Sequence, residues 1–586
     1  MSSEKSEIKI CQNCKKEFTI EPDDFGFYEK IKVPPPTFCP ECRFARRMSW
    51  RNERALYKRK CDATGENIIS IFTTASGYKA YEEKYWWSDK WDPLDYGKDY
   101  DFSKPFFKQF GELLKRVPQL ALFNTLHINS EYCNYATHNK DCYLFTGGGW
   151  NEKLLYVNRS TNSKDSADCY IIEKAEFCYD CLYCYGCYKL THSSNCYNCL
   201  ESSFLYNCRN CNNCFGCTNL VSKSYCIWNE QYSKEEYEKK ISEMNMGSFK
   251  SLQKLQENFK KEIYLQSIHK YAELISCKNV TGDHVRSARN CTYCFDLGGD
   301  NTENCHYATW SGFGAKDLFD VGPGAGWVSE LVYESVDTID TSNILGCMTI
   351  HNSNNIFYSV NCHSSSNLFG CCGLKKKSYC ILNHQYTKAQ YEELIPKIIQ
   401  QMNEMLYIDD IGNSYAYGEF FPAELSPFCY NETIAQEYFP LTKEQALKQG
   451  YRWKDRVERN YEIDIKTKDI PDNIKEVNEE IIGKVIECEH KGTCNEQCTE
   501  AFKIIESEYQ FYQRMNLPIP HLCPNCRHYQ RLKQRNPLKL WHRQCMCDKK
   551  NHANHSEKCE VEFETSYAPE RPEIVYCEKC YQQEVY

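Results

Sequence analysis

Long hydrophobic runs are missing from this sequence, although apolar residues make up 41% of its 586 positions. A membrane-spanning helix needs about 20 predominantly apolar residues in a row, and no stretch reaches that length. The opening residues, MSSEKSEIKI, also lack the apolar centre of a secretory signal peptide. We therefore expect no membrane segment and a cytoplasmic location.

The motifs of the common enzyme classes are missing as well. The sequence contains no HExxH helix, no GxSxG nucleophile elbow, no Walker lysine motif and no dinucleotide-binding fingerprint. Two glycine-rich stretches, 147–149 and 322–326, lack the strand, helix and lysine that surround a phosphate-binding loop, so we expect turns there. These absences favour a protein that is not an enzyme.

A strong positive charge is also absent, because the net charge is -9. This value argues against a uniformly basic nucleic-acid binder but leaves room for local basic patches. The residue in excess is cysteine, with 39 copies. In a long chain without an export signal, clustered cysteines more often hold metal than form disulfides.

Cysteine pairs near the N-terminus have the spacing of a structural zinc site. Cys11 and Cys14 form one CxxC pair, and Cys39 and Cys42 form another. Each CxxC turn directs two thiolates at one point, and two such turns complete a tetrahedral site. The sequence therefore predicts a zinc ion bound by these four residues.

A second copy of this unit begins 484 positions later and predicts a second zinc site. Its expected ligands are Cys494, Cys498, Cys523 and Cys526. The last three match Cys14, Cys39 and Cys42 without a gap. However, three residues separate Cys494 from Cys498, whereas two separate Cys11 from Cys14. Cys488 or His490 could therefore take the place of Cys494. A fifth matched pair, Cys61 and Cys545, could supply a ligand or simply be buried.

The C-terminal end contains a third candidate site. We expect the CxxC pair Cys577 and Cys580 to bind zinc with Cys559 and with either His555 or Cys547. The total is then about three zinc ions per chain. A zinc ion with four protein ligands has no open coordination position, so these sites predict structural roles and not catalysis.

A basic stretch follows each of the two matched units, and four arginines agree between the copies. They are Arg43, Arg47, Arg51 and Arg59 in the first copy and Arg527, Arg531, Arg535 and Arg543 in the second. Steps of four residues place three of each set on one helix face. One interpretation is a face that grips phosphates. The other is a set of arginines that pair with acids elsewhere on this acidic chain.

The centre of the chain, from about 129 to 405, repeats itself. Five cysteines between 178 and 196 recur 30 residues later, and the stretch 215–227 returns 154 residues later at 369–381. Such periods are typical of stacked supersecondary units. Asparagines beside the cysteines fit turn corners and amide ladders. They are Asn195, Asn207, Asn213, Asn361 and Asn367.

The central cysteines follow a CxxCxxCxxC spacing that approaches but does not match that of ferredoxins. In the larger repeat, Cys196 becomes Ile350 and Cys214 becomes Leu368. A metal ligand should not change to Ile or Leu, whereas a free cysteine packs as a small hydrophobic residue. We expect a buried ladder of cysteines, with additional metal or disulfides as the alternatives.

Together these patterns predict a mostly β protein with inserted α-helices, in which zinc-ribbon or treble-clef-like modules flank a β-solenoid-like repeat centre. The expected divisions are 1–102 (zinc module with a basic helix and an aromatic segment), 103–128 (helical linker), 129–232 (first cysteine-ladder repeat), 233–276 (helical insertion), 277–405 (second repeat and closing helix), 406–485 (connector), 486–545 (second zinc module) and 546–586 (C-terminal zinc ribbon). Capping-box patterns at Ser233, Thr387 and Thr442 predict helix starts.

Several phrases along the chain resemble cysteine-rich zinc-ribbon proteins encoded in environmental bacterial genomes, a group without a known activity. Among these phrases are CPECRFARR, FGCCGLKKKSYCILNHQY and RPEIVYCEKCYQQEVY. The resemblance covers nearly the whole chain. It implies an architecture but no activity, so it assigns no role to any residue.

We therefore expect a non-enzymatic zinc-binding scaffold that binds nucleic acid, RNA more than DNA, through the basic helices of its zinc modules. One alternative is a structural scaffold for protein–protein contacts. The other is a β-solenoid enzyme that acts on a polymer. Only phosphate contacts by basic side chains would make the affinity for RNA strongly dependent on salt.

Overall fold

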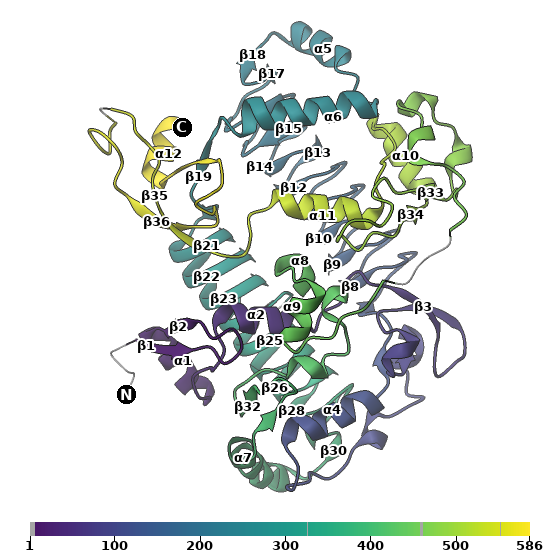
Figure 1. Ribbon diagram of the computed structural model, residues 1–586, viewed down its shortest axis with the longest axis vertical. Coiled ribbons are helices and arrows are strands. Elements are labelled where there is room, and N and C mark those ends of the chain that lie inside the picture. The colour runs from purple at the N-terminus through teal and green to yellow at the C-terminus, as the bar shows by residue number, and fades with distance from the viewer. Residues whose placement is uncertain (1–5, 325, 457–460, 551, 586) are drawn as a thin grey trace.

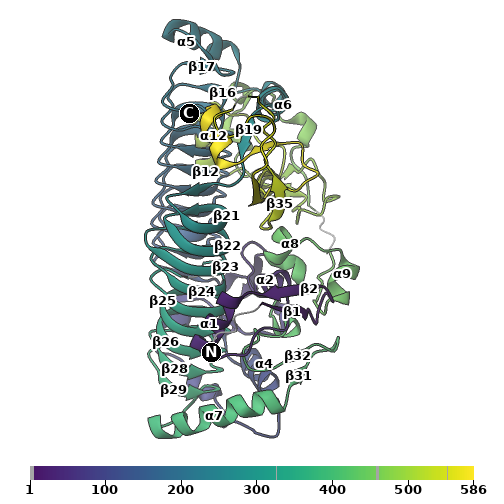
Figure 2. The ribbon, with the colours of Figure 1, turned by 90° about the vertical axis from the view of Figure 1, so that its left-hand side faces the viewer.

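Two large sheets dominate the structure, which is a computed structural model that describes residues 6–324, 326–456, 461–550 and 552–585 (Figure 1). Their strands stack in a column along the long axis, and most of the other elements lie on one side of this column (Figure 2). The expected mostly β architecture with inserted helices is confirmed. Within the described ranges, no helix is long and apolar enough to cross a membrane.

The first sheet has twelve strands. They are β7 (Asn124–Thr125), β8 (Asn134–Thr137), β9 (Thr146–Gly149), β10 (Asn158–Thr161), β11 (Tyr170–Glu173), β12 (Leu182–Tyr185), β13 (Tyr188–Thr191), β14 (Ser194–Tyr197), β15 (Leu200–Tyr206), β16 (Phe215–Thr218), β17 (Cys226–Ile227) and β18 (Glu230–Gln231). All neighbours are parallel except the terminal pair β17 and β18. Asn158 pairs with Thr146 on one side and with Tyr170 on the other. Paired residues of neighbouring strands are therefore 12 positions apart in the sequence, and we call this separation the offset.

The second sheet has eleven strands. They are β20 (Leu274–Ile275), β21 (Lys278–Arg286), β22 (Ala288–Gly298), β23 (Thr302–Gly312), β24 (Lys316–Val321), β25 (Glu330–Leu345), β26 (Met348–Phe357), β27 (Val360–His363), β28 (Ser366–Phe369), β29 (Ser378–Ile381) and β30 (His384–Gln385). Its offset is 14 residues where Thr292 pairs with His306. The offset settles at 12 residues from the pair Val336 and Met348 onward.

A bend at every third residue explains the CxxC spacing of the first sheet. Phe177, Asp180 and Tyr183 all have a positive φ. Each is followed directly by a fully buried cysteine, so residues three positions apart point into the same interior. The five asparagines expected at turn corners also have positive φ values, which short polar side chains tolerate better than most. The turn-corner prediction is confirmed, and the expected amide ladder occurs where Asn355 Nδ2 donates to Asn367 Oδ1 at 3.2 Å.

The central cysteines are buried, as the sequence predicts, except for Cys277, which is partly exposed. Between 133 and 226 they share one apolar core with Val, Leu, Ile and Ala side chains. Their thiols donate to carbonyl groups, and Cys181 Sγ lies 3.4 Å from the carbonyl oxygen of Tyr179 and 3.5 Å from that of Leu190. In the part of the chain that the structure describes, none of them belongs to a group that could hold a metal ion.

The two sheets lie side by side and run in opposite directions. The ring of Tyr183 stacks on His284 at 3.6 Å, and Trp150 stacks on Trp327 at 5.6 Å. Residue numbers therefore fall along one sheet as they rise along the other, and in Figure 1 the first sheet leads toward α5 while the second descends toward α7.

Both cysteine units have the same order of elements. The first contains β1 (Glu7–Ile10), β2 (Glu17–Ile20), α1 (Pro22–Ile31), α2 (Pro40–Met48), β3 (Tyr57–Lys60) and β4 (Asn67–Ser70). The second contains β33 (Ile486–Glu487), β34 (Ala501–Phe502), α10 (Glu506–Met515), α11 (Pro524–Gln534), β35 (Trp541–Gln544) and β36 (Glu562–Thr565). The first residues of α1 and α10 are 484 positions apart, as are those of α2 and α11. Both α2 and α11 begin with a proline, which tolerates the first helical position because its missing N–H has no partner there anyway.

Further helices pack around the sheets. They are α3 (Glu83–Trp87), α4 (Phe106–Arg116), α5 (Lys234–Glu243), α6 (Phe249–Asn258), α7 (Lys388–Glu404), α8 (Ala435–Tyr438), α9 (Lys443–Lys448) and, after the short strand β37 (Ile574–Tyr576), α12 (Glu578–Val585). Ser233, Thr387 and Thr442 cap α5, α7 and α9 with reciprocal side-chain bonds. The three predicted capping boxes are confirmed.

We predict that the ladder cysteines can be replaced by small residues at modest cost. Cys211→Ser and Cys214→Ala should each lower the free energy of unfolding by about 1–2 kcal/mol, because packing is lost but no buried charge is exposed. Denaturant unfolding and elemental analysis of the same samples would test this. Loss of metal from either variant would show that the cysteine is a ligand.

Candidate metal centres

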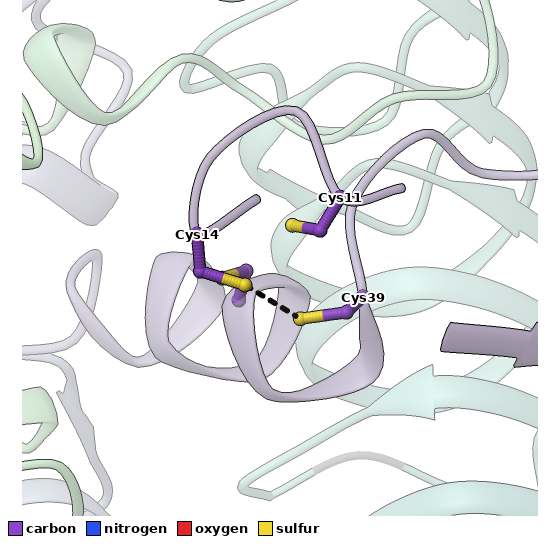
Figure 3. A group of neighbouring side chains, drawn as sticks. Cys11, Cys14 and Cys39 are labelled. Carbon is purple, nitrogen blue, oxygen red and sulfur yellow. Dashed lines mark hydrogen bonds between the residues drawn. The ribbon is translucent and has the colours of Figure 1, made fainter. Parts of the chain in front are cut away.

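The four cysteines of the N-terminal unit converge as expected. Cys11 and Cys14 lie on the turn after β1, while Cys39 and Cys42 begin α2. Their sulfur atoms lie within 4.8 Å of one another, and those of Cys14 and Cys39 are 3.7 Å apart (Figure 3). Zn–S bonds of about 2.3 Å in a tetrahedron separate sulfurs by about 3.8 Å, whereas a disulfide holds them at about 2.05 Å. The group has the dimensions of a metal site.

The second unit forms a similar group, but Cys488 occupies the place expected for Cys494. The group contains Cys488, Cys498, Cys523 and Cys526. The backbone N–H of Cys488 donates to the carbonyl oxygen of Glu500, as the N–H of Cys11 does to that of Lys16, 484 positions earlier. Cys488 is therefore the counterpart of Cys11. Ten positions separate it from Cys498, against three between Cys11 and Cys14, so a longer turn hides the match.

A third group of four thiols lies at the C-terminal end. It contains Cys545, Cys559, Cys577 and Cys580. Cys545 directly follows β35. The sequence left open whether Cys61 and Cys545 could be ligands or are simply buried, and Cys545 belongs to a group that could hold a metal ion. Its counterpart Cys61 is buried but belongs to no metal-sized group among the described residues. Cys547 and His555, the alternatives for the fourth ligand, lie in a neighbouring group together with His552 and Cys580.

Short contacts between the thiols shift their pKa values in opposite directions. Contacts with Cys488, Cys498 and Cys526 lower the pKa of Cys523, whereas the same kind of contacts raise the pKa of Cys526. Backbone amides also point at sulfur, since the N–H of Cys523 donates to Cys488 Sγ at 3.3 Å. Hydrogen bonds of this kind favour the thiolate, which is the form that binds metal.

The matched arginines do not form the exposed face that phosphate binding requires. Arg43, Arg47, Arg51, Arg59, Arg527 and Arg531 are buried, the side chain of Arg535 is 5% exposed, and Arg543 is half-buried against the carbonyl oxygens of Tyr567 and Ala568. Two of them, Arg51 and Arg59, donate to Glu53 at 2.7 Å and to Asp62 at 2.6 Å. The expectation of phosphate-gripping helices is therefore corrected, because these side chains have partners inside the protein.

The arginines of α2 contact acids on strands of the second sheet, and those of α11 contact Asp168, which lies between β10 and β11 of the first sheet. Arg43 and Arg47 donate to the two oxygens of Asp320 at 2.9 and 3.1 Å, and Arg47 also donates to Glu334 at 2.8 Å. In the second unit, Arg531 donates to Asp168 at 2.7 Å and Arg527 forms an ion pair with the same carboxylate at 3.2 Å. Burial lowers the pKa of Arg43, but Asp320 together with Tyr28 and Tyr333 outweighs burial and raises that pKa well above its usual value.

A cavity of about 750 Å³ lies between the first sheet, α6 and α11. Its walls include the stacked rings of Tyr183 and His284 and the side chains of His192, Glu273 and Arg531. Nε2 of His192, Oε2 of Glu273 and Nη2 of Arg531 are buried and have no hydrogen-bond partner among the described residues. Burial raises the pKa of Glu273. No local pattern in the sequence predicts this cavity, because its walls come from segments that are far apart in the chain.

Comparison with known proteins adds no family and no relative: no family model and no curated protein matches this chain. The resemblance to zinc-ribbon proteins therefore stays a prediction. The metal groups, the buried arginines and the cavity are the basis for assigning a function.

We predict that Cys488, and not Cys494, binds metal in the second unit. Cys488→Ser should remove one metal ion per chain and unfold the unit, because metal binding there contributes directly to folding. Cys494→Ser should retain the full metal content. Elemental analysis of both purified variants would distinguish them, and the reverse pattern would restore Cys494 as the ligand.

Proposed function

We propose that the protein is a non-enzymatic scaffold of two β-solenoids side by side, with one zinc module fastened to each solenoid. The observation that carries this proposal is the burial of module arginines against acids of the sheets. The 12-residue offset supports a solenoid with 12 residues per turn. The bend at every third residue supports sides of three residues each. Cysteine, serine and aliphatic residues at the inward position of each side fill its interior.

Zinc fits the thiol groups better than other metals. Each group offers four cysteines at tetrahedral spacing, and thiolate sets of this kind are typical of structural zinc. One pair lies in a turn and the other begins a helix, which favours a treble-clef-like module over a simple ribbon. With four protein ligands, no position is open for a substrate. The metals would therefore stabilise the modules and take no part in catalysis.

The two modules dock in matching ways. The ring of Tyr28 contacts Tyr333 at 5.6 Å, and the ring of Tyr512 contacts Tyr179 at 6.0 Å. The module tyrosines are 484 positions apart and the sheet tyrosines are 154 positions apart, which are the two periods found in the sequence. Each module therefore occupies an equivalent place on its own solenoid. This arrangement accounts for the arginines that both copies share.

The cavity is the place where this scaffold would bind a ligand. Its volume lies within the range of roughly 300–1,000 Å³ that is usual for small-molecule sites. The guanidinium of Arg531 offers an unpartnered donor to an anion, and the stacked rings of Tyr183 and His284 offer an apolar wall. We therefore favour an anionic ligand with a planar ring, such as a nucleotide. The sequence led us to expect RNA binding. We now propose that the cavity binds one nucleotide, either a free nucleotide or the terminal nucleotide of an RNA strand.

We predict that removing a docking arginine destabilises the protein without a specific effect on RNA. Arg47→Ala should lower the free energy of unfolding by about 3–5 kcal/mol, because the buried carboxylates of Asp320 and Glu334 each lose a close cationic partner. The control Arg289→Ala removes an arginine that is 64% exposed, and an exposed ion pair contributes about 1 kcal/mol or less.

Denaturant unfolding and the salt dependence of RNA binding would be measured on both variants. A variant of Arg47 that keeps its stability but loses salt-sensitive RNA binding would restore the phosphate-gripping helix.

We predict that adenosine monophosphate binds in the cavity. It should raise the melting temperature of the wild-type protein, and Gln253→Trp, which places a large ring at the cavity wall, should abolish this shift. The control Lys254→Trp changes the next residue of α6, which does not line the cavity. Isothermal titration with the nucleotide and with inorganic phosphate would measure both variants. Equal binding by wild type and Gln253→Trp would place the ligand elsewhere, and no binding by the wild type would reject this ligand class.

A further inference from the structure

The C-terminal unit has more metal-binding side chains than one zinc ion can use. Two groups of four donors overlap there. The first contains Cys545, Cys559, Cys577 and Cys580, and the second contains Cys547, His552, His555 and Cys580. Within each group the donor atoms lie within 4.8 Å of one another, and Cys580 belongs to both. We propose that this unit holds two zinc ions bridged by the thiolate of Cys580.

The first of the two ions would have four sulfur ligands. The sulfurs of Cys559 and Cys577 are 4.0 Å apart, close to the tetrahedral edge of about 3.8 Å. The backbone N–H of Cys577 donates to Cys545 Sγ at 3.2 Å, which favours the thiolate. All four cysteines are buried. This half of the centre resembles the sites of the other two modules.

The second ion would have two sulfur and two nitrogen ligands. Nε2 of His555 lies 3.3 Å from Cys580 Sγ, and Zn–N and Zn–S bonds of about 2.0 and 2.3 Å give a tetrahedral edge of about 3.5 Å. Nδ1 of the same ring lies 2.7 Å from the carbonyl oxygen of Glu557. This carbonyl holds the proton on Nδ1, so the lone pair of Nε2 faces the sulfur, as in metal-bound histidines.

His552 gives an independent indication of a ligand. Its side chain is 1% exposed, yet neither ring nitrogen has a hydrogen-bond partner among the residues that the structure describes. An unsatisfied buried polar group is costly, and its ring stacks on that of His555 at 4.6 Å, next to Cys580. Oε1 of Glu584 lies 3.3 Å from Nε2 outside hydrogen-bond geometry. A carboxylate in this position commonly orients a histidine that binds metal through its other nitrogen.

A similar overlap in the second module differs in its burial and in its charges. There, His490, Cys494 and Glu496 lie close to Cys526. However, Nδ1 of His490 lies 3.2 Å from Glu496, and Lys533 bonds to the same carboxylate. The lysine already compensates the carboxylate, and the His490 side chain is 28% exposed whereas that of His552 is 1% exposed, so we assign no second ion to that module. The complete chain should then bind four zinc ions, one in each of the matched modules and two at the C-terminal end.

Native mass spectrometry and elemental analysis of the full-length protein test this count. The wild type should contain four zinc ions per chain, and a count of three would overturn the proposal even if a variant failed to fold. His552→Ala and Cys547→Ser should each reduce the count to three, because each removes a ligand of the second ion only. The control His542→Ala changes a histidine on β35 that is 64% exposed, and it should retain all four.

Cys494→Ser separates the C-terminal ion from any additional ion in the second module. The Cys494→Ser variant should also retain four zinc ions. If Cys494→Ser lost a zinc ion while His552→Ala retained all four, the fourth ion would belong to the second module and the assignment would be wrong. Cobalt substitution gives a second readout. Cobalt-loaded His552→Ala should lose the absorption of the site with mixed nitrogen and sulfur ligands and keep that of the four-sulfur sites. An unchanged spectrum would contradict the proposal.

Discussion

One buried carboxylate in each half of the protein binds two arginines from one helix, and the arrangement of modules and sheets depends on these contacts. Asp320 binds Arg43 and Arg47, and Asp168 binds Arg527 and Arg531. Leaving a charge buried without a partner costs several kcal/mol. Each sheet therefore requires its module, and a helix satisfies the acid only if its arginines lie one turn apart.

Metal binding and docking are connected through the first turn of these helices. Cys39 is the residue before α2, and Arg43 follows it by four positions. The backbone N–H of Arg43 donates to the carbonyl oxygen of Cys39, so the helix begins at a candidate metal ligand. An ion that fixes Cys39 and Cys42 thus also fixes the direction in which the arginines point. A module without its metal would lose the geometry that Asp320 needs.

Local spacing made part of this structure predictable, while distant partners stayed hidden. The CxxC pairs identified most of the thiols that could hold a metal ion, because two thiols that share a turn must point together. Cys488 was missed as the first choice because the longer turn before Cys498 obscures its match with Cys11. The acids of the docking contacts lie 273–363 positions from their arginines, so no local pattern links them. The 12-residue offset is present in the sequence as Cys184, Cys196 and Cys208, but the more obvious 30-residue recurrence concealed it.

The interior of the sheets explains why cysteine is so abundant here. Serine occupies the same inward position elsewhere, and Ser166 donates to the carbonyl oxygen of Lys164 at 2.8 Å while accepting from the N–H of Cys178, 12 residues later. Cys178 and Cys181 make the corresponding contacts with carbonyl groups through sulfur. A narrow interior with inward-facing carbonyls selects a small side chain that carries a weak donor. Cysteine meets this requirement with less polar surface to bury than serine, so the ladder follows from packing, and the cysteines that could bind metal lie outside it, in the modules.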